Sequence, residues 1–201
     1  RNANLATTFD FGFALGPRIN AAGRLADMTL GIECLLTDDA ARADELARTL
    51  DGINRERRVI ESDMREQALD IAESLFEEGQ DAPAAICVFD PDFHEGVVGI
   101  VASRIKDKLH RPVFAFAPAE PGSAMLKGSA RSIPGLHIRD ALAAVDALNP
   151  GLVERFGGHA MAAGLSLPAA HFERFRQALE AQVATLLSPE QLLSELHSDG
   201  E

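Results

Sequence analysis

The stretch from residue 38 to residue 79 contains no proline, and this long uninterrupted run limits the possible folds more than any other feature of the chain. Asp38 or Asp39 can cap the start of a helix there, and a Gly-Gln-Asp-Ala-Pro sequence at 79–83 ends it. A helix of about 40 residues is ~60 Å long at a rise of about 1.5 Å per residue. Its apolar residues recur at steps of three and four and form one stripe, made of Leu46, Leu50, Ile53, Ile60, Met64, Ala68, Ile71 and Leu75. We predict a rod that joins two lobes; a coiled-coil dimer is the alternative, which a break in the stripe at Arg57 disfavours.

After this helix the chain alternates between apolar runs and helical patterns. Residues 84–89 form a continuous apolar run typical of a buried strand, residues 96–109 have helical periodicity, and residues 111–116 form a second apolar run. These segments predict a βαβ unit. Further along, we predict a strand at 123–131, a helix at 137–148, a strand at 161–167 and a helix at 170–187. The predicted fold class is α/β, with a mixed β-sheet flanked by helices.

Composition is typical of a cytoplasmic globular protein. The 201 residues are 46% hydrophobic, which is enough to bury a core. No apolar run approaches the roughly 20 residues that span a bilayer, and the start of the chain lacks the apolar segment of a signal peptide. Cys34 and Cys87 lack the spacing of a zinc site, which predicts reduced, buried thiols. Because the chain begins at Arg1 rather than at Met, we expect a fragment whose upstream part is absent.

Two short segments, Lys127–Ser132 (KGSARS) and Phe156–Gly164 (FGGHAMAAG), combine small residues with cations and a histidine. Glycine and alanine let the backbone approach a phosphate closely, and the Arg131 guanidinium can bind two of its oxygens. The net charge of −12 argues against a nucleic-acid partner, but the acidic residues lie mainly in the long helix and the tail. We predict a local cationic groove that binds a phosphodiester; the alternative is that these basic residues only solvate the surface.

A third basic segment, 18–24 (RINAAGR), precedes the long helix in a run of helical spacing from Ile19 to Leu36 that Gly23 and Gly31 interrupt. Asn20 and Arg24 are four residues apart and can share a helical face with Arg18. The full set of candidate phosphate or nucleic-acid contacts is Arg18, Asn20, Arg24, His94, Lys127, Ser129, Arg131, Ser132, Gly157, Gly158 and His159. The chain has no Trp or Tyr for base stacking, so we expect binding with little sequence preference.

His94 belongs to a loop that leaves the first predicted strand and enters the next helix. The N-terminus of a helix favours an anion, so His94 is placed to contact a phosphate. An alternative interpretation takes Asp90, Asp92 and His94 as ligands of Mg²⁺, Mn²⁺ or Zn²⁺. Alternate acidic residues are common in turns and caps, which favours the phosphate interpretation.

Four segments together resemble the RecJ family, the single-strand-specific 5′ to 3′ DNA exonucleases of the DHH phosphoesterase superfamily. They are Gly16–Arg24 (GPRINAAGR), His94–Arg104 (HEGVVGIVASR), Lys127–His137 (KGSARSIPGLH) and Phe156–Gly164 (FGGHAMAAG). Their order and spacing cover most of residues 10 to 170. Two positions depart from the family pattern, since Phe93 stands where Trp is common and Phe156 stands where a third Gly is common.

The resemblance implies a division of labour within a nuclease of DNA repair and recombination. Residues 1–37 would be the end of a DHH metal domain, 38–80 the connecting helix, 81–187 the DHH-associated domain and 188–201 an acidic linker or tail. The Asp-His-His tripeptide and the Asp-x-Asp ligand segment of the family are absent from the sequence, so the family's two Mn²⁺ or Mg²⁺ ions, and every catalytic residue, would lie outside this chain. The candidate residues would hold the DNA backbone and orient the 5′ end toward those metals.

The expected partners are single-stranded DNA and the missing N-terminal DHH domain of the same protein, in a monomer without membrane contact. Three alternatives remain open at this point. The chain could belong to a phosphodiesterase for short oligonucleotides or cyclic dinucleotides, which would bind dinucleotides as tightly as long strands. It could be a non-enzymatic RNA-binding module like that of alanyl-tRNA synthetases, which would prefer a structured tRNA. It could also be a purely structural dimerisation rod without nucleic-acid affinity.

Overall fold

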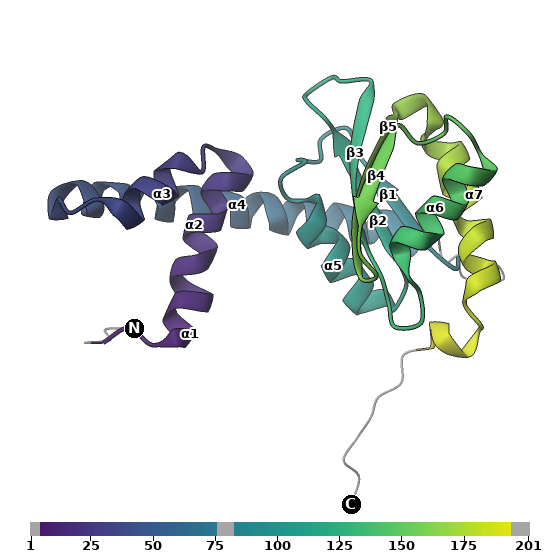
Figure 1. Ribbon diagram of the computed structural model, residues 1–201, viewed down its shortest axis with the longest axis horizontal. Helices are drawn as coiled ribbons and strands as arrows, with labels where there is room; N and C mark the ends of the chain where they lie inside the picture. The colour runs from purple at the N-terminus through teal and green to yellow at the C-terminus, as the bar shows by residue number, and fades with distance from the viewer. Residues whose placement is uncertain (1–4, 76–82, 194–201) are drawn as a thin grey trace, which may run out of the picture. The chain divides into compact units, whose positions relative to one another are not determined.

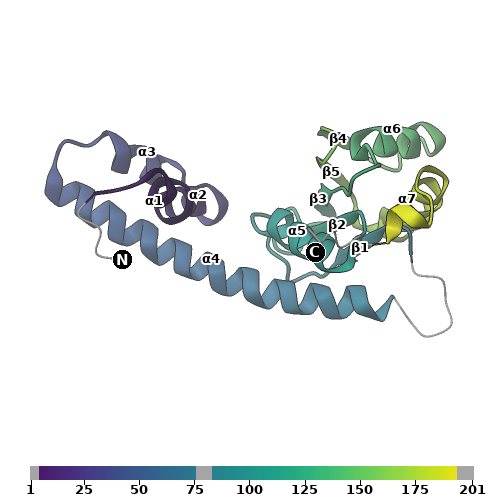
Figure 2. The same ribbon diagram turned by 90° about the horizontal axis from the view of Figure 1, so that it is seen from below.

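A computed structural model describes residues 5–75 and 83–193 of the chain, which divides into two compact units, residues 1–62 and 63–201. The predicted end of the long helix at residues 76–80 and the predicted tail from residue 194 onward lie outside the described residues. Figures 1 and 2 show the elements, which follow one another as α1 (Thr8–Asp10), the π-helix η1 (Phe11–Leu15), α2 (Gly16–Leu25), α3 (Thr29–Leu36), α4 (Ala40–Ser74), β1 (Ile86–Phe89), α5 (Val98–Leu109), β2 (Val113–Pro118), β3 (Met125–Arg131), α6 (Ile138–Leu148), β4 (Arg155–Gly158), β5 (Ala162–Pro168), the 3₁₀ turn η2 (Ala169–His171), α7 (Phe172–Leu186) and the 3₁₀ turn η3 (Glu190–Leu192). Among the described residues, no helix is both long enough and apolar enough to cross a membrane.

Helices α2 and α3 are separated at a different place from the one that the glycines suggest. The chain leaves the helix after Leu25, and α3 starts where the carboxylate of Asp27 accepts a hydrogen bond of 2.8 Å from the backbone N–H of Thr29. Gly23 and Gly31 both lie inside helices. A Cβ on Gly31 would lie 3.0 Å from Cγ2 of Ile19, so this glycine allows α3 to pack closely on α2.

Helix α4 confirms the predicted long helix over the part of the chain that the structure describes. Its first turn is capped by Asp39, whose carboxylate accepts hydrogen bonds from the backbone N–H groups of residues 41 and 42 at 2.9 and 3.3 Å. Six of its residues are buried, five of them apolar: Leu46, Leu50, Asn54, Met64, Ala68 and Ala72. At the predicted break in the stripe, Arg57 forms an ion pair of 2.7 Å with Glu61, one turn along the helix.

The second unit contains a five-stranded sheet in the order β1-β2-β3-β5-β4. Strands β1 and β2 are parallel and are joined through α5, which confirms the predicted βαβ unit. All other neighbours are antiparallel. The sheet is therefore mixed and flanked by helices, as predicted from the sequence.

The main core lies between the sheet and helices α6 and α7 (Figure 1). Side chains alternate along each strand, so every second residue faces this core. Phe175 of α7 is fully buried there and makes edge contacts with Phe114 and Phe116 of β2, at ring-centroid distances of 5.8 and 5.6 Å. Cys87 of β1 is also part of this core, and burial raises the pKa of its thiol. Cys87 therefore agrees with the predicted buried thiol, whereas Cys34 is only half-buried.

The opposite face of the sheet is covered by a helix over only part of its width. Helix α5 packs against β2 and β3 on this face, using Val98, Val101, Ala102 and Ile105. The antiparallel strands β3, β5 and β4 continue beyond α5, and both Gly157 and Gly164 are exposed there. This uncovered half-face is accessible to a ligand.

Candidate nucleic-acid interface

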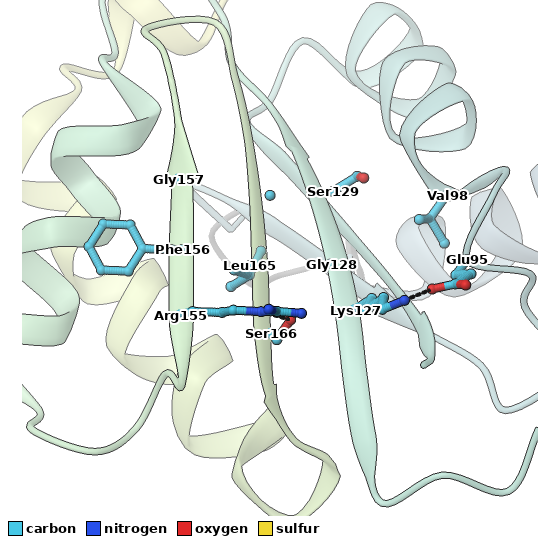
Figure 3. Close-up of a pocket in the computed structure, with 11 residues that line it drawn as sticks. Glu95, Val98, Lys127, Gly128, Ser129, Arg155, Phe156, Gly157, Leu165 and Ser166 are labelled. Carbon is cyan, nitrogen blue, oxygen red and sulfur yellow. Dashed lines mark hydrogen bonds and ion pairs between the residues drawn. The ribbon is translucent and has the colours of Figure 1, made fainter. Parts of the chain in front are cut away.

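A cleft of about 450 Å³ lies on the uncovered half-face, between α5 and strands β3, β5 and β4. Figure 3 shows its residues, which are Glu95, Val98, Lys127, Gly128, Ser129, Arg155, Phe156, Gly157, Gly164, Leu165 and Ser166. Two segments that are about thirty residues apart in sequence meet here, because β5 pairs with β3 on one side and with β4 on the other. The KGSARS segment in β3 and the FGGHAMAAG segment, which runs from β4 into β5, thus lie side by side in the sheet.

Strand register arranges the floor of the cleft in two rows. In the first row, Ser166 of β5 lies opposite Lys127 of β3 and opposite Arg155 of β4. In the second row, Gly164 lies between Ser129 and Gly157. The first row carries two cations and a hydroxyl, and the second row carries almost no side-chain volume.

The two cations of the first row point in the same direction, so that Arg155 points toward Lys127 and Lys127 points away from Arg155 toward Glu95 (Figure 3). Figure 3 shows the Arg155 side chain extending from β4 across β5 toward Lys127, with its Nε 3.5 Å from the Oγ of Ser166. Lys127 forms an ion pair of 2.5 Å with Glu95, and both side chains are about half exposed. Glu95 precedes α5, whose first residue, Val98, also lines the cleft. The lining of the cleft thus carries two cations and one carboxylate beside the positive end of the α5 dipole, which makes the cleft locally cationic in an acidic protein.

The two glycines of the GG pair occupy different environments. A Cβ on Gly157 would have no atom within 4 Å, so this position is open to a ligand. Gly158 has φ +148, and a Cβ there would lie 2.4 Å from the carbonyl oxygen of Ala162. Gly157 is therefore part of the open floor, whereas Gly158 is required by the close pairing of the β4–β5 hairpin.

Arg131, the last residue of the cleft strand β3, and Ser132, which follows it, have different surroundings. The Arg131 Nε donates to the Oγ of Ser103 in α5 at 3.1 Å, beside Ser129. Ser132 is 1% exposed, and its hydroxyl donates to the backbone oxygen of Leu136 at 2.7 Å. The hydroxyl of Ser132 is thus hydrogen-bonded in the protein interior. Of Ser129, Arg131 and Ser132, the first two lie on the cleft side of the sheet.

The two candidate histidines lie apart from the two rows. His159 is exposed at the tip of the β4–β5 hairpin, where its backbone N–H donates to the oxygen of Ala162 at 2.8 Å. His94 lines a second pocket, together with Asp92 and Glu120, and its Nδ1 accepts a hydrogen bond from the backbone N–H of Gly96 at 3.1 Å.

No group of three His, Cys, Asp or Glu side chains is arranged to hold a metal ion within residues 5–75 and 83–193. The carboxylate of Asp90 instead accepts a hydrogen bond from the backbone N–H of Asp92 at 2.9 Å, as in an ordinary turn. The described residues therefore do not fit a metal centre, and the loop of Asp90, Asp92 and His94 is a turn rather than a metal site.

The three candidates of the first unit lie on α2. Arg18 forms an ion pair of 2.8 Å with Asp51 of α4 and donates to the backbone oxygen of Ala14. Asn20 and Arg24 are exposed. Hydrogen bonds from Arg55 and then Arg18 hold the pKa of the Asp51 carboxyl below its usual value.

Three polar residues of the cleft were not among the candidates predicted from the sequence: Arg155, Ser166 and Glu95. The signal for Arg155 was its alternation with Gly157, which places both on one face of a strand. The signal for Ser166 was a single hydroxyl residue between two leucines in a predicted buried strand. Neither signal reveals a cleft without the register of the strands.

Residues 81–185 match the DHHA1 domain family. The whole chain is 51% identical over 201 residues to the single-stranded-DNA-specific exonuclease RecJ of Dickeya dadantii, and 50% identical over 200 residues to that of Escherichia coli K12. The RecJ of Thermus thermophilus is 36% identical over 180 residues. The chain spans about a third of the length of the first two relatives, 34% in each case.

Solved structures agree with these sequence similarities. A crystal structure of the Thermus thermophilus RecJ in complex with Mg²⁺ superposes with a TM-score of 0.75 at 36% identity, over 90% of this chain and 26% of that one. A crystal structure of exonuclease RecJ bound to manganese superposes with a TM-score of 0.76 at 36% identity, over 94% of this chain and 44% of that one.

Proposed function

Because this chain belongs to the DHHA1 domain family and is homologous over its whole length to RecJ exonucleases, we propose that it is the single-stranded-DNA-binding part of such an enzyme. The observation that carries the proposal is the cleft on the second unit, where Lys127 and Arg155 lie beside a floor of glycines. The homology also agrees with the family resemblance predicted from the four sequence segments. A DNA substrate is consistent with the expected cytoplasmic location.

The chemistry of the cleft fits a phosphate backbone rather than a base. Lys127, Arg155 and the hydroxyls of Ser129 and Ser166 are donors to phosphate and sugar oxygens. No aromatic ring is offered for stacking by the residues that line the cleft, since Phe156 packs against the core on the other face of the sheet (Figure 3). A phosphate of a bound DNA strand would replace Glu95 as the ion-pair partner of Lys127. We therefore expect tolerance of base sequence and a strong dependence on salt.

Phosphodiester hydrolysis itself is assigned to the remainder of the protein. Relatives have been crystallised with Mg²⁺ and with Mn²⁺, but the described residues of this chain fit no metal centre. The proposed role of the chain is to hold the strand and to orient its 5′ end toward the metals of the remaining domain, as the family resemblance implies. Arg131 and Ser129 lie beside α5 and are further proposed contacts of the strand.

Single substitutions of the cleft cations test the proposal. In the full-length protein, with EDTA present to prevent cleavage, Lys127→Ala and Arg155→Ala are each expected to weaken binding of single-stranded oligothymidine by about 1 kcal/mol, roughly fivefold in Kd. Each should also lower the slope of log affinity against log salt by about 0.7, the value for one phosphate contact on a single strand. Fluorescence anisotropy over a salt series measures both quantities.

Arg174→Ala is the matched control, because Arg174 is exposed on α7, on the other side of the sheet. It removes the same charge and should leave the slope unchanged. Equal behaviour of all three variants would mean that the cleft does not bind the strand. Tighter binding of a dinucleotide or of a folded tRNA would instead favour the other phosphodiesterases or the RNA-binding module.

The first unit exposes apolar residues that we propose to be covered by the rest of the protein. Phe9 and Phe13 stack at 4.7 Å between ring centroids, and Phe13 is 70% exposed. Leu35 and Leu36 at the end of α3 are exposed as well. Exposed apolar side chains at this density are typical of an interface, which supports the assignment of residues 1–37 to the end of a larger domain.

Phe13→Ser should therefore have different effects in two contexts. In the 201-residue chain alone, it removes only the stacking contact, worth about 0.5–1.5 kcal/mol. In the full-length protein, it should lower the free energy of unfolding by a further ~1.5–3 kcal/mol, the value for a buried Phe. Urea denaturation of both proteins measures the difference, with Val59→Ser of α4 as an exposed control. The same small effect in both contexts would rule out the proposed interface.

A further inference from the structure

The guanidinium of Arg131 lies against helix α5, at the side of the proposed cleft. Arg131 is the last residue of β3, the strand beside which α5 packs (Figure 1). Its Nε donates to the Oγ of Ser103 at 3.1 Å, and its Nη1 donates to the backbone oxygen of Ala130 at 2.8 Å. Among the contacts that orient this side chain are thus one acceptor from its own strand and one from the helix.

The helix acceptor is itself oriented by a hydrogen bond. The hydroxyl of Ser103 donates to the backbone oxygen of Gly99, one turn earlier in α5, at 3.1 Å. A hydroxyl has one proton and two lone pairs, so this bond directs a lone pair of Ser103 toward the Nε–H of Arg131. Gly99, Ser103 and Arg131 therefore form one connected group.

Gly99 provides the space in which the guanidinium lies. A Cβ on Gly99 would lie 2.9 Å from Nη2 of Arg131 and 3.4 Å from the Oγ of Ser129. Any side chain at this position would displace the end of Arg131, because that end is the flexible partner in the contact. The same glycine also brings the guanidinium next to Ser129, which lines the cleft.

We infer that Gly99 and Ser103 are positioning residues for Arg131, which hold its guanidinium in place for a phosphate of the bound strand. The inference rests on the proposed function and extends it from the cleft to helix α5. An unrestrained arginine side chain populates many rotamers, and a ligand that must order it binds less tightly. Fixing the guanidinium beforehand removes that cost, and the planar fork of arginine makes the fixed orientation useful for recognising phosphate oxygens.

Gly99→Ala separates positioning from stability, because its two effects have opposite signs. Alanine favours a helix more than glycine does, so the melting temperature should stay the same or rise. The added methyl group should displace Arg131, so Kd for single-stranded oligothymidine should rise severalfold. Gly52→Ala in α4 is the matched control, since a Cβ at Gly52 has no atom within 4 Å. This control should also keep or raise the melting temperature, and it should leave Kd unchanged.

Ser103→Ala tests the second positioning residue through a double-mutant cycle in the full-length protein with EDTA present. Ser103→Ala should raise Kd in the wild-type background and should have no further effect in the Arg131→Ala background. Ser74→Ala removes a helix hydroxyl that bonds a backbone oxygen of its own helix, and it should change Kd in neither background. Melting temperatures exclude unfolding as the cause of any loss.

The outcomes distinguish the inference from the proposed function. If Arg131→Ala weakens binding but Ser103→Ala and Gly99→Ala do not, the positioning role is wrong and the cleft proposal stands. If Ser103→Ala weakens binding equally in both backgrounds, its effect does not act through Arg131, and the inference is again wrong. If Arg131→Ala leaves both Kd and the salt slope unchanged, the inference and the assignment of Arg131 as a phosphate contact fail together.

Discussion

Phe175→Ala is expected to lower the free energy of unfolding by about 3–5 kcal/mol, the usual cost of removing a buried aromatic side chain. Phe175 of α7 is fully buried and contacts two phenylalanines of β2, Phe114 and Phe116, edge to face. Alanine would leave a cavity between the helix and the sheet, and the aromatic contacts would be lost. Urea denaturation measures the change as a lower midpoint at an unchanged m-value.

Leu186→Ala is a suitable control, because Leu186 belongs to the same helix and is about half exposed. Its cost should be small, within about 0.5 kcal/mol. A loss below about 1 kcal/mol for Phe175→Ala would contradict the assignment of this residue to the centre of the core. The core also supports the cleft from behind: a Cβ on Gly128 would lie 2.5 Å from the Phe116 ring, so the cleft strand β3 packs directly on the same aromatic group.

The second large effect is expected from Gly158→Ala. The positive φ of +148 at Gly158 disfavours any side chain, which costs about 1–3 kcal/mol. In addition, the new methyl group would lie 2.4 Å from the oxygen of Ala162 and 2.5 Å from the Cα of Ala163, and relieving this overlap costs a further ~1–3 kcal/mol. We expect the β4–β5 hairpin to separate, with faster amide hydrogen exchange in β4 and a lower melting temperature.

Gly157→Ala is the matched substitution at the neighbouring glycine. Its methyl group would meet no atom within 4 Å, and Gly157 has no positive φ, so the melting temperature should not fall. The two variants make the same glycine-to-alanine change at adjacent positions, yet only Gly158→Ala should destabilise the hairpin. A similar loss of stability in both would show that the hairpin does not adopt this geometry.

Much of the fold could be predicted because the apolar patterns of the second unit are strong. The continuous apolar runs at 84–89 and 111–116 correspond to β1 and β2, with boundaries that differ by about two residues. Strand β4 was missed, because its sequence Arg-Phe-Gly-Gly contains two residues of low β-propensity and no alternation of apolar residues. Its pairing with β5 stabilises it in spite of its composition.

The break between α2 and α3 illustrates a second limit of sequence patterns. Gly23 and Gly31 looked like interruptions, but both lie within helices, and the chain turns instead where Asp27 bonds the backbone N–H of Thr29. A glycine that serves close helix packing and a glycine that ends a helix look the same in a single sequence.

The candidate site was predicted only in part for a related reason. Lys127, Ser129 and Gly157 were identified from composition, and the structure brings all three to one cleft. Arg155 and Ser166 become neighbours of Lys127 only through the register of β3, β5 and β4, which no local pattern contains. The contacts that orient Arg131 depend on α5, a helix that is distant in sequence from β3.

The position of β5 between β3 and β4 makes the site sensitive to whether the β4–β5 turn gains an odd or an even number of residues. Successive residues of a strand point to opposite faces, and β5 is held in register by β3, so a one-residue insertion in the β4–β5 turn that shifted the pairing would turn the edge strand β4 over. Phe156 would then face the cleft, and the Arg155 guanidinium would face the apolar core. Insertions that preserve binding should therefore add residues in pairs or leave the extra residue outside the ladder as a bulge.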